Sequence, residues 1–153
     1  MADQYTGGCL CNSFRYQFKT EPQTVYICHC TECQKISSSA FGMSVRVNSD
    51  DFKTTRGTGK LIKTTADSGR TKKVLFCPEC GTTISGKPTS GSFIVVKAGT
   101  LDNPNWFRPI AHIWTKSAQS WFSFSDGLPK YRQAPKNKDE LNRLWLNYVS
   151  ETK

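Results

Sequence analysis

The stretch Cys28-His29-Cys30-Thr31-Glu32-Cys33 ("CHCTEC") brings three cysteines into six consecutive residues. Thiols this close together form a disulfide, contribute to a structural metal site, or make a metal site that lacks one protein ligand. The chain of 153 residues matches one domain of ordinary size, which folds without covalent crosslinks. Its seven cysteines therefore need another explanation.

The setting of the chain favours metal binding over oxidation. The first residues contain no apolar run typical of a signal peptide, and no later segment approaches the roughly 20 apolar residues of a membrane span. We therefore expect a cytoplasmic protein without a membrane partner. Disulfides are rare in the cytoplasm, and an odd number of cysteines would leave one thiol unpaired.

The charge balance is basic, with 21 Lys and Arg against 12 Asp and Glu, a net charge of +9. Such a balance attracts nucleic acids, anionic membrane surfaces or small acidic ligands. Nucleic-acid binding needs the charge gathered into a patch, whereas here only residues 70–73 and 130–138 form modest clusters. A nucleic-acid partner is therefore not expected.

Most of the chain has the pattern of short strands separated by turns. Polar and apolar side chains alternate within the segments, and Gly, Asp, Asn and Ser separate them. The predicted strands cover residues 13–18, 25–28, 43–47, 60–65, 72–76, 92–97, 111–115 and 121–125. The fold class is therefore mainly β.

The C-terminus has a helical pattern instead. From residue 138 onward, Leu141, Leu144, Trp145 and Tyr148 are spaced at i, i+3, i+4 and i+7, so one stripe of a helix is apolar. The pattern favours a helix that packs on the sheet over one that binds a partner.

The cysteines fall into three groups: Cys9-Leu10-Cys11, the CHCTEC stretch, and Cys77-Pro78-Glu79-Cys80-Gly81. The last group is a zinc-knuckle pattern, which supplies half of a tetrahedral site. If the first group completes it, three contiguous cysteines remain, and three ligands with an open position are typical of catalytic zinc. Completion by two central cysteines would leave the remaining thiols on distant segments. We prefer the first division on spacing, and the second stays open.

The two histidines are weaker candidates. Alternate side chains of an extended stretch point to opposite faces, so His29 should point away from a metal held by Cys28 and Cys30. His112 lies in an apolar segment, where a structural role is the more common one. A place in the wall of a pocket stays open for it.

The chain resembles the glutathione-dependent formaldehyde-activating enzyme (GFA) family, also called the centromere protein V domain family. The resemblance rests on Gly8-Cys9-Leu10-Cys11, the CHCTEC stretch, Ser39-Ala40-Phe41, Phe76-Cys77-Pro78-Glu79-Cys80-Gly81, His112-Ile113-Trp114 and Asp126-Gly127-Leu128-Pro129. It implies an Mss4-like, zinc-binding β fold of short antiparallel strands. We expect such a domain over residues 1–135, with residues 136–153 forming a helix docked on it.

The resemblance also implies two Zn²⁺ sites. A structural zinc would be held by Cys9, Cys11, Cys77 and Cys80. A catalytic zinc with an open fourth position would be held by Cys28, Cys30 and Cys33. The named activity of the family joins glutathione to formaldehyde and gives S-hydroxymethylglutathione.

Three positions depart from the pattern of the family. Asn12 stands where relatives often have Gly, and Asn tolerates left-handed backbone better than most residues. After Cys33 two basic residues and then a Gly are common, whereas this chain has Gln34-Lys35 and Ser38. These changes next to the second site leave the expected fold unchanged and the substrate open.

The ligand set predicts the chemistry. Three thiolates make zinc a poor Lewis acid, but the ion can still bind a fourth thiol in its ionised form. We predict a carbon–sulfur lyase or synthase that handles glutathione, or a glutathione conjugate, together with a carbonyl compound. Weaker candidates are Lys35 and Arg46 for the carboxylates of the thiol, and Phe41, Trp114 and Trp121 for the pocket walls.

Two other functions compete with this prediction. The chain could be a non-catalytic, zinc-stabilised module that binds protein or nucleic acid. Alternatively, all seven thiols could serve stability alone. Neither the electrophile nor the oligomeric state follows from the sequence.

Overall fold

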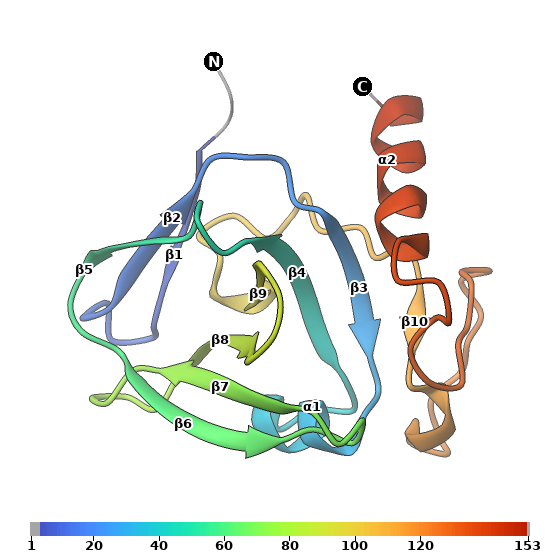
Figure 1. The fold of residues 1–153 in the computed structure, drawn as a ribbon, viewed down its shortest axis with the longest axis horizontal. Coiled ribbons are helices and arrows are strands. Elements are labelled where there is room, and N and C mark those ends of the chain that lie inside the picture. The colour runs from blue at the N-terminus through green and yellow to red at the C-terminus, as the bar shows by residue number, and fades with distance from the viewer. Residues whose placement is uncertain (1–3, 153) are drawn as a thin grey trace. The chain divides into compact units, whose positions relative to one another are not determined.

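The computed structural model describes residues 4–152 and confirms the mainly β class. Figure 1 shows the course of the chain. The strands are β1 (Tyr5–Gly8), β2 (Arg15–Phe18), β3 (Thr24–Cys28), β4 (Gly42–Asn48), β5 (Lys53–Arg56), β6 (Lys60–Thr65), β7 (Thr71–Phe76), β8 (Thr83–Pro88), β9 (Phe93–Lys97) and β10 (His112–Ile113). The helices are α1 (Thr31–Ser37) and α2 (Glu140–Thr152), with 3-10 turns at Ala98–Thr100 and Thr115–Ser117.

The chain divides into two compact units, and each is described by itself. The first unit comprises residues 4–22 and 45–107, and the second comprises residues 23–44 and 108–152. Strand β4 therefore begins in the second unit and ends in the first.

The first unit contains two sets of antiparallel strands. β2 lies between β1 and β5, and β6 to β9 follow one another as a meander (Figure 1). Along β2, Tyr16 and Phe18 are buried while Arg15 and Gln17 are partly exposed, as alternation in a half-buried strand requires. The apolar side chains of β2 thus form part of the core.

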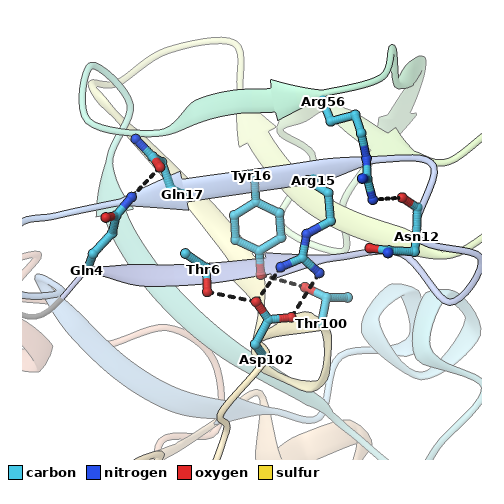
Figure 2. Close-up of polar contacts among 9 residues, drawn as sticks. All are labelled: Gln4, Thr6, Asn12, Arg15, Tyr16, Gln17, Arg56, Thr100 and Asp102. Atoms are coloured by element: carbon cyan, nitrogen blue, oxygen red, sulfur yellow. Dashed lines mark hydrogen bonds and ion pairs between the residues drawn. The ribbon is translucent and has the colours of Figure 1, made fainter.

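Polar contacts tie the first sheet to the loop after β9 (Figure 2). The Arg15 guanidinium is paired with the Asp102 carboxylate, which also accepts a hydrogen bond from the Thr6 hydroxyl (2.7 Å). The Tyr16 hydroxyl lies 2.8 Å from the hydroxyl of Thr100. Polar side chains of β1 and β2 are therefore hydrogen-bonded to Thr100 and Asp102 within the first unit.

The second unit is built on β3, and it contains a parallel pair. β10 runs parallel to β3, with His112 opposite Ile27 and Ile113 opposite Cys28. This pair departs from the expected antiparallel arrangement.

The predicted C-terminal helix is confirmed. Helix α2 packs against β3, where the Thr24 hydroxyl donates a hydrogen bond to the Leu141 carbonyl (2.9 Å). Leu141 and Trp145 are buried, as the apolar stripe predicted. None of the helices in residues 4–152 is long and apolar enough to span a membrane.

Some predicted elements differ from the observed ones. Residues 121–125 form neither helix nor strand, although burial alternates along them, and only His112–Ile113 of the predicted strand 111–115 is a strand. The sequence missed β1, β5, β8 and α1. β1 ends in two glycines and β5 is exposed throughout, so neither shows apolar alternation, and α1 has only seven residues.

Candidate metal centres

Two turns of the first unit bring together four cysteines: Cys9, Cys11, Cys77 and Cys80. In the turn between β1 and β2, the Cys9 amide donates a hydrogen bond to the Phe14 carbonyl (3.1 Å). In the turn between β7 and β8, the Cys77 amide donates in the same way to the Thr82 carbonyl (2.9 Å). Each turn is therefore closed by an equivalent backbone hydrogen bond, which joins residues five positions apart in the chain.

The residue after the second cysteine is left-handed in both turns. Gly81 has φ of 75° and Asn12 has φ of 63°. Gly adopts this conformation without steric cost, and Asn tolerates it better than most residues. The departure from Gly at position 12 is thus accommodated by the backbone.

The sulfur positions fit a tetrahedral metal site. The Sγ atoms of Cys9 and Cys11 are 3.6 Å apart, those of Cys11 and Cys77 are 3.8 Å apart, and all four lie within 4.8 Å of one another. Four sulfurs at about 2.3 Å from a zinc ion would be separated by about 3.8 Å in an ideal tetrahedron. This group can therefore hold a closed, four-coordinate ion.

Hydroxyl groups surround these sulfurs. The Ser13 hydroxyl lies 3.0 Å from Sγ of Cys11 and 3.2 Å from Sγ of Cys77. The Thr82 hydroxyl lies 3.2 Å from Sγ of Cys80, and its hydrogen bond lowers the pKa of that thiol to about 5. Hydrogen-bond donors that stabilise thiolates also favour metal binding.

The second group, which we call the three-cysteine cluster, consists of Cys28, Cys30 and Cys33 in the second unit. Cys28 is the last residue of β3, and Cys30 caps helix α1, where its sulfur accepts a hydrogen bond from the Cys33 amide (3.3 Å). Each of the three residues is only 6% exposed. The strand end and the first helical turn therefore hold three buried sulfurs from one short stretch.

The three sulfurs also lie within 4.8 Å of one another, and no fourth Cys, His, Asp or Glu in residues 4–152 joins the group. Hydrogen bonds with Cys30 and Cys33, together with burial, raise the pKa of Cys28 well above its usual value. For Cys30, the hydrogen bond with Cys28 lowers the pKa, but the one with Cys33 and burial outweigh it and raise the pKa to about 11. Because crowded buried thiols resist ionisation, this donor set suits a cation that compensates the thiolate charge.

His29 lies between two of these cysteines in the chain and is linked to His112. Its Nε2 is 2.9 Å from Nδ1 of His112, and Nε2 of His112 is 2.7 Å from Oδ2 of Asp126. Both imidazoles are fully buried. Burial and the nearby His112 lower the pKa of His29 to about 4, although Cys33 opposes this shift.

The carboxylate of Asp126, which is hydrogen-bonded to His112, favours its ionised form. Burial acts to raise the pKa of Asp126, but the hydrogen bonds from His112 and from the Leu128 amide (3.1 Å) outweigh it and lower the pKa. His112 is therefore a buried histidine with polar partners at both ring nitrogens.

Gln34 fixes the backbone beside the three-cysteine cluster. Its side-chain amide donates 2.8 Å hydrogen bonds to the carbonyls of His29 and Ser117. Its oxygen accepts a hydrogen bond from the Gln119 side chain (2.9 Å). The residue that replaces a basic one in the pattern of the family thus joins the start of α1 and His29 to residues 117–119.

Three phenylalanines surround the His29 ring: Phe41, Phe122 and Phe124. Their ring centroids lie 5.6, 4.9 and 5.2 Å from that of His29. Phe122 and Phe124 also contact each other and the ring of His112. The imidazole pair therefore lies in an aromatic environment.

The weaker candidates from the sequence have different surroundings. Trp121 is 70% exposed and Trp114 is buried, with the Lys116 ammonium 4.9 Å from its ring centroid. Lys35 is exposed in the last turn of α1. Arg46 lies in the first unit, where its guanidinium lies 3.9 Å from the centroid of the Phe93 ring. Of the predicted pocket walls, Phe41 is the one that contacts His29.

Sequence reasoning missed Phe122, Phe124 and the pairing of His112 with Asp126. The alternation of residues 121–125 was the available signal, because it places the two phenylalanines on one face. The interpretation as a paired strand hid their role. No spacing rule connects residues 14 positions apart, such as His112 and Asp126.

Three comparisons with known proteins give the following results. A search of curated proteins found no match. A crystal structure of a Rhodobacter sphaeroides protein is similar at 15% identity, over 82% of this chain and 98% of that chain, with a TM-score of 0.49. Residues 4–117 match the family model described as "Glutathione-dependent formaldehyde-activating enzyme". With its two cysteine clusters in a mainly β, Mss4-like fold, the chain therefore belongs to the GFA family.

Proposed function

We propose that this protein is a zinc-dependent enzyme of the GFA type that makes or breaks the carbon–sulfur bond of a glutathione adduct. Cys9, Cys11, Cys77 and Cys80 would hold a structural zinc, and the three-cysteine cluster would hold the catalytic one. The observation that supports this most is the difference in ligand number, four in one cluster and three in the other within residues 4–152.

In the proposed reaction, the sulfur of glutathione bonds to a carbonyl carbon such as that of formaldehyde. The carbonyl oxygen takes up a proton in place of the one that the thiol loses, and a hydroxymethyl thioether results. The reverse reaction breaks the same bond. A zinc ion, when bound, would supply an open position that favours the ionised form of a thiol, which is otherwise mostly protonated at neutral pH.

The residues of the chain supply position and shielding. The amide of Cys33 and the side chain of Gln34 fix the backbone around the cluster. The rings of Phe122 and Phe124 pack beside His29 and reduce access of water to it. Burial of this kind protects a thiol adduct from exchange with solvent.

Native mass spectrometry of the zinc-loaded protein tests the proposal. We expect two zinc ions per chain and one saturable adduct with glutathione. S-methylglutathione, which has no free thiol, is the matched control and should not form that adduct. Addition of formaldehyde should give S-hydroxymethylglutathione in a parallel NMR assay.

One zinc ion and no glutathione adduct would contradict the proposal. In that case the first cluster would serve as a scaffold, and the protein would be better described as a binding module. A salt titration of DNA binding would then test the nucleic-acid version of that function.

A further inference from the structure

The first unit contains an open depression of about 510 Å³ beside strands β2 and β5. Its lining residues are Asn12, Arg15, Thr55 and Arg56. Figure 2 shows the two arginines together with Asn12, which lies in the turn between β1 and β2. A volume of this size is within the range of small-molecule sites, and the lining side chains offer hydrogen-bond donors from two guanidiniums, an amide and a hydroxyl.

A bulge in β5 brings both arginines to one face of the sheet. Tyr16 pairs with Thr54. The neighbouring residue Arg15 pairs with Arg56, so Thr55 is an extra residue in β5. In regular pairing Thr55 would lie opposite Arg15, and Arg56 would point to the other face. The bulge instead places the Arg56 side chain on the face of Arg15, and bulges are known to redirect side chains in this way.

The two arginines therefore place like charges directly opposite each other, which destabilises a pair of strands. The Asp102 carboxylate compensates the charge of Arg15, whose Nη1 lies 2.9 Å from Oδ1 and whose Nη2 contacts Oδ2. Among residues 4–152 no carboxylate pairs with Arg56, which donates a hydrogen bond to the backbone carbonyl of Asn12. One positive charge at the depression thus lacks a counterion from this part of the chain.

Both guanidiniums keep donors that a ligand can use. The Asp102 carboxylate takes one N–H from each terminal nitrogen of Arg15, and the Asn12 carbonyl takes one from Arg56. A guanidinium has more N–H groups than these contacts use. Lys53 lies opposite Gln17 on the same face of the sheet and adds a further positive charge. The arrangement therefore suits an anion with several acceptor oxygens.

We propose that this depression binds the phosphate group of a small phosphate monoester, with Arg15 and Arg56 as its main ligands. Such a group carries close to two negative charges at neutral pH and three acceptor oxygens, and arginine contacts it in bidentate fashion. A carboxylate has one charge and two oxygens, so it would use fewer of the donors. The Thr55 hydroxyl and the Asn12 amide would supply further hydrogen bonds. The site belongs to the first unit and does not depend on the proposed function.

Titration of the zinc-loaded protein with inorganic phosphate and with phenyl phosphate tests the proposal. Nitrogen NMR of the arginine side chains follows binding, and chloride keeps the ionic strength constant. We expect saturable shifts at Arg15 and Arg56 with both probes, and much weaker binding of acetate. A short single-stranded DNA is the second arm, because its phosphodiesters carry one charge each, and it should bind more weakly than phenyl phosphate at physiological salt.

Matched substitutions assign the binding to the depression. Arg56→Gln should weaken phosphate binding about tenfold or more, because it removes charge-assisted hydrogen bonds. Arg56→Lys keeps the charge but loses the planar guanidinium, so its affinity should fall between the two. Arg70→Gln is the control, since it removes the same charge from an exposed residue of the same unit that does not line the depression.

Two further variants change the site in opposite directions. Asp102→Asn releases the Arg15 guanidinium from its carboxylate, so phosphate should bind more tightly. Thr55→Val removes one hydroxyl and should weaken binding about threefold. Without phosphate, Arg56→Gln should not lower Tm, because it relieves the repulsion with Arg15. Circular dichroism and zinc content show that each variant is folded.

Four outcomes would overturn the proposal. Unchanged phosphate affinity in a folded Arg56→Gln would show that the arginines are not the ligands. An equal loss in Arg70→Gln would reduce the effect to net charge. Acetate that binds as tightly as phosphate would remove the preference for a phosphate group. Tighter binding of the DNA than of phenyl phosphate, abolished by Arg56→Gln, would assign the depression to a nucleic-acid backbone instead of a small monoester.

Discussion

The two cysteine clusters use the same ligand atom in different settings. The first joins Cys11 and Cys77, 66 positions apart, through two similar turns, and its Cys11 is exposed. The second takes all its sulfurs from one stretch, and each is buried. Two equivalent turns each supply one pair of ligands, so together they provide all four ligands of a tetrahedral site. A strand end that runs into a helix supplies three ligands from one short stretch.

The largest expected difference between the two clusters is in the effect of removing one cysteine from each. Cys77→Ser changes the first cluster, and Cys30→Ser changes the three-cysteine cluster. Structural zinc contributes on the order of 10 kcal/mol to folding in zinc-finger peptides, which equals the stability of a typical domain. We therefore expect Cys77→Ser to unfold the first unit. Cys30→Ser should lose one zinc ion and all turnover but keep its fold.

Circular dichroism, zinc content and turnover of the two variants check this expectation. A folded Cys77→Ser with normal zinc content would show that the first cluster is not structural. Full activity in Cys30→Ser would rule out the proposed catalytic site.

Removal of zinc by a chelator is a second way to compare the two clusters. We expect EDTA to remove zinc from the three-cysteine cluster first, because only three protein ligands would hold the ion there and its fourth position would exchange. Exposure of Cys11 alone would predict the opposite order. The zinc released with time, followed alongside glutathione binding and the circular dichroism signal, distinguishes the two. Loss of secondary structure before loss of glutathione binding would contradict our expectation.

Asn12 and Ser38 stand where relatives often have Gly, one beside each cluster. Substituting Gly at these positions should change the free energy of unfolding by a smaller amount. Ser38 ends α1 with φ of 50°, and a left-handed conformation costs a residue with a side chain about 1–2 kcal/mol. We expect Ser38→Gly to raise the free energy of unfolding by about 1 kcal/mol, which is a rise in Tm of about 2–4 °C. Asn12→Gly should give less, because Asn tolerates this conformation.

Thermal denaturation measures both substitutions. Ser39→Gly is the control, since Ser39 is not among the positive-φ residues and Gly there should lower Tm. If Asn12→Gly raised Tm as much as Ser38→Gly or more, the backbone strain at the two positions would differ from what their φ angles indicate.

The smallest expected effect comes from Asp102, which belongs to neither cysteine cluster. Hydrogen bonds from Arg15 and Thr6 lower the pKa of this carboxyl, although burial opposes them. A lowered folded pKa stabilises the protein above the unfolded pKa, and this contribution is lost as pH falls through the folded value. Because the side chain is 44% exposed, we expect Asp102→Asn to cost less than about 1 kcal/mol at neutral pH.

Urea denaturation of this variant and of the natural protein at several pH values measures the difference. The gap in the free energy of unfolding should be largest at neutral pH and should close in acid. A gap that widens as the pH falls would contradict the assigned cause.

Local pattern predicted much of the fold. Strand β6 has the predicted bounds, and β3, β4, β7 and β9 differ from the prediction by one or two residues, since alternation is a property of consecutive residues. The grouping of Cys9 and Cys11 with the knuckle was preferred from spacing, and the structure gathers those four sulfurs. Helix α1 escaped prediction because seven residues are too few for a helical period to stand out.

The sequence by itself determined the mainly β class and the C-terminal helix, and it favoured one division of the cysteines, because each follows from residue type and spacing along the chain. Only the tertiary structure decided that Phe122 and Phe124 surround His29, and that His112 joins His29 to Asp126. Such contacts depend on where β3, β10 and an unpaired loop lie in space. Long-range packing and hydrogen bonding leave no periodic trace in the sequence, so this part of the site became visible only in the fold.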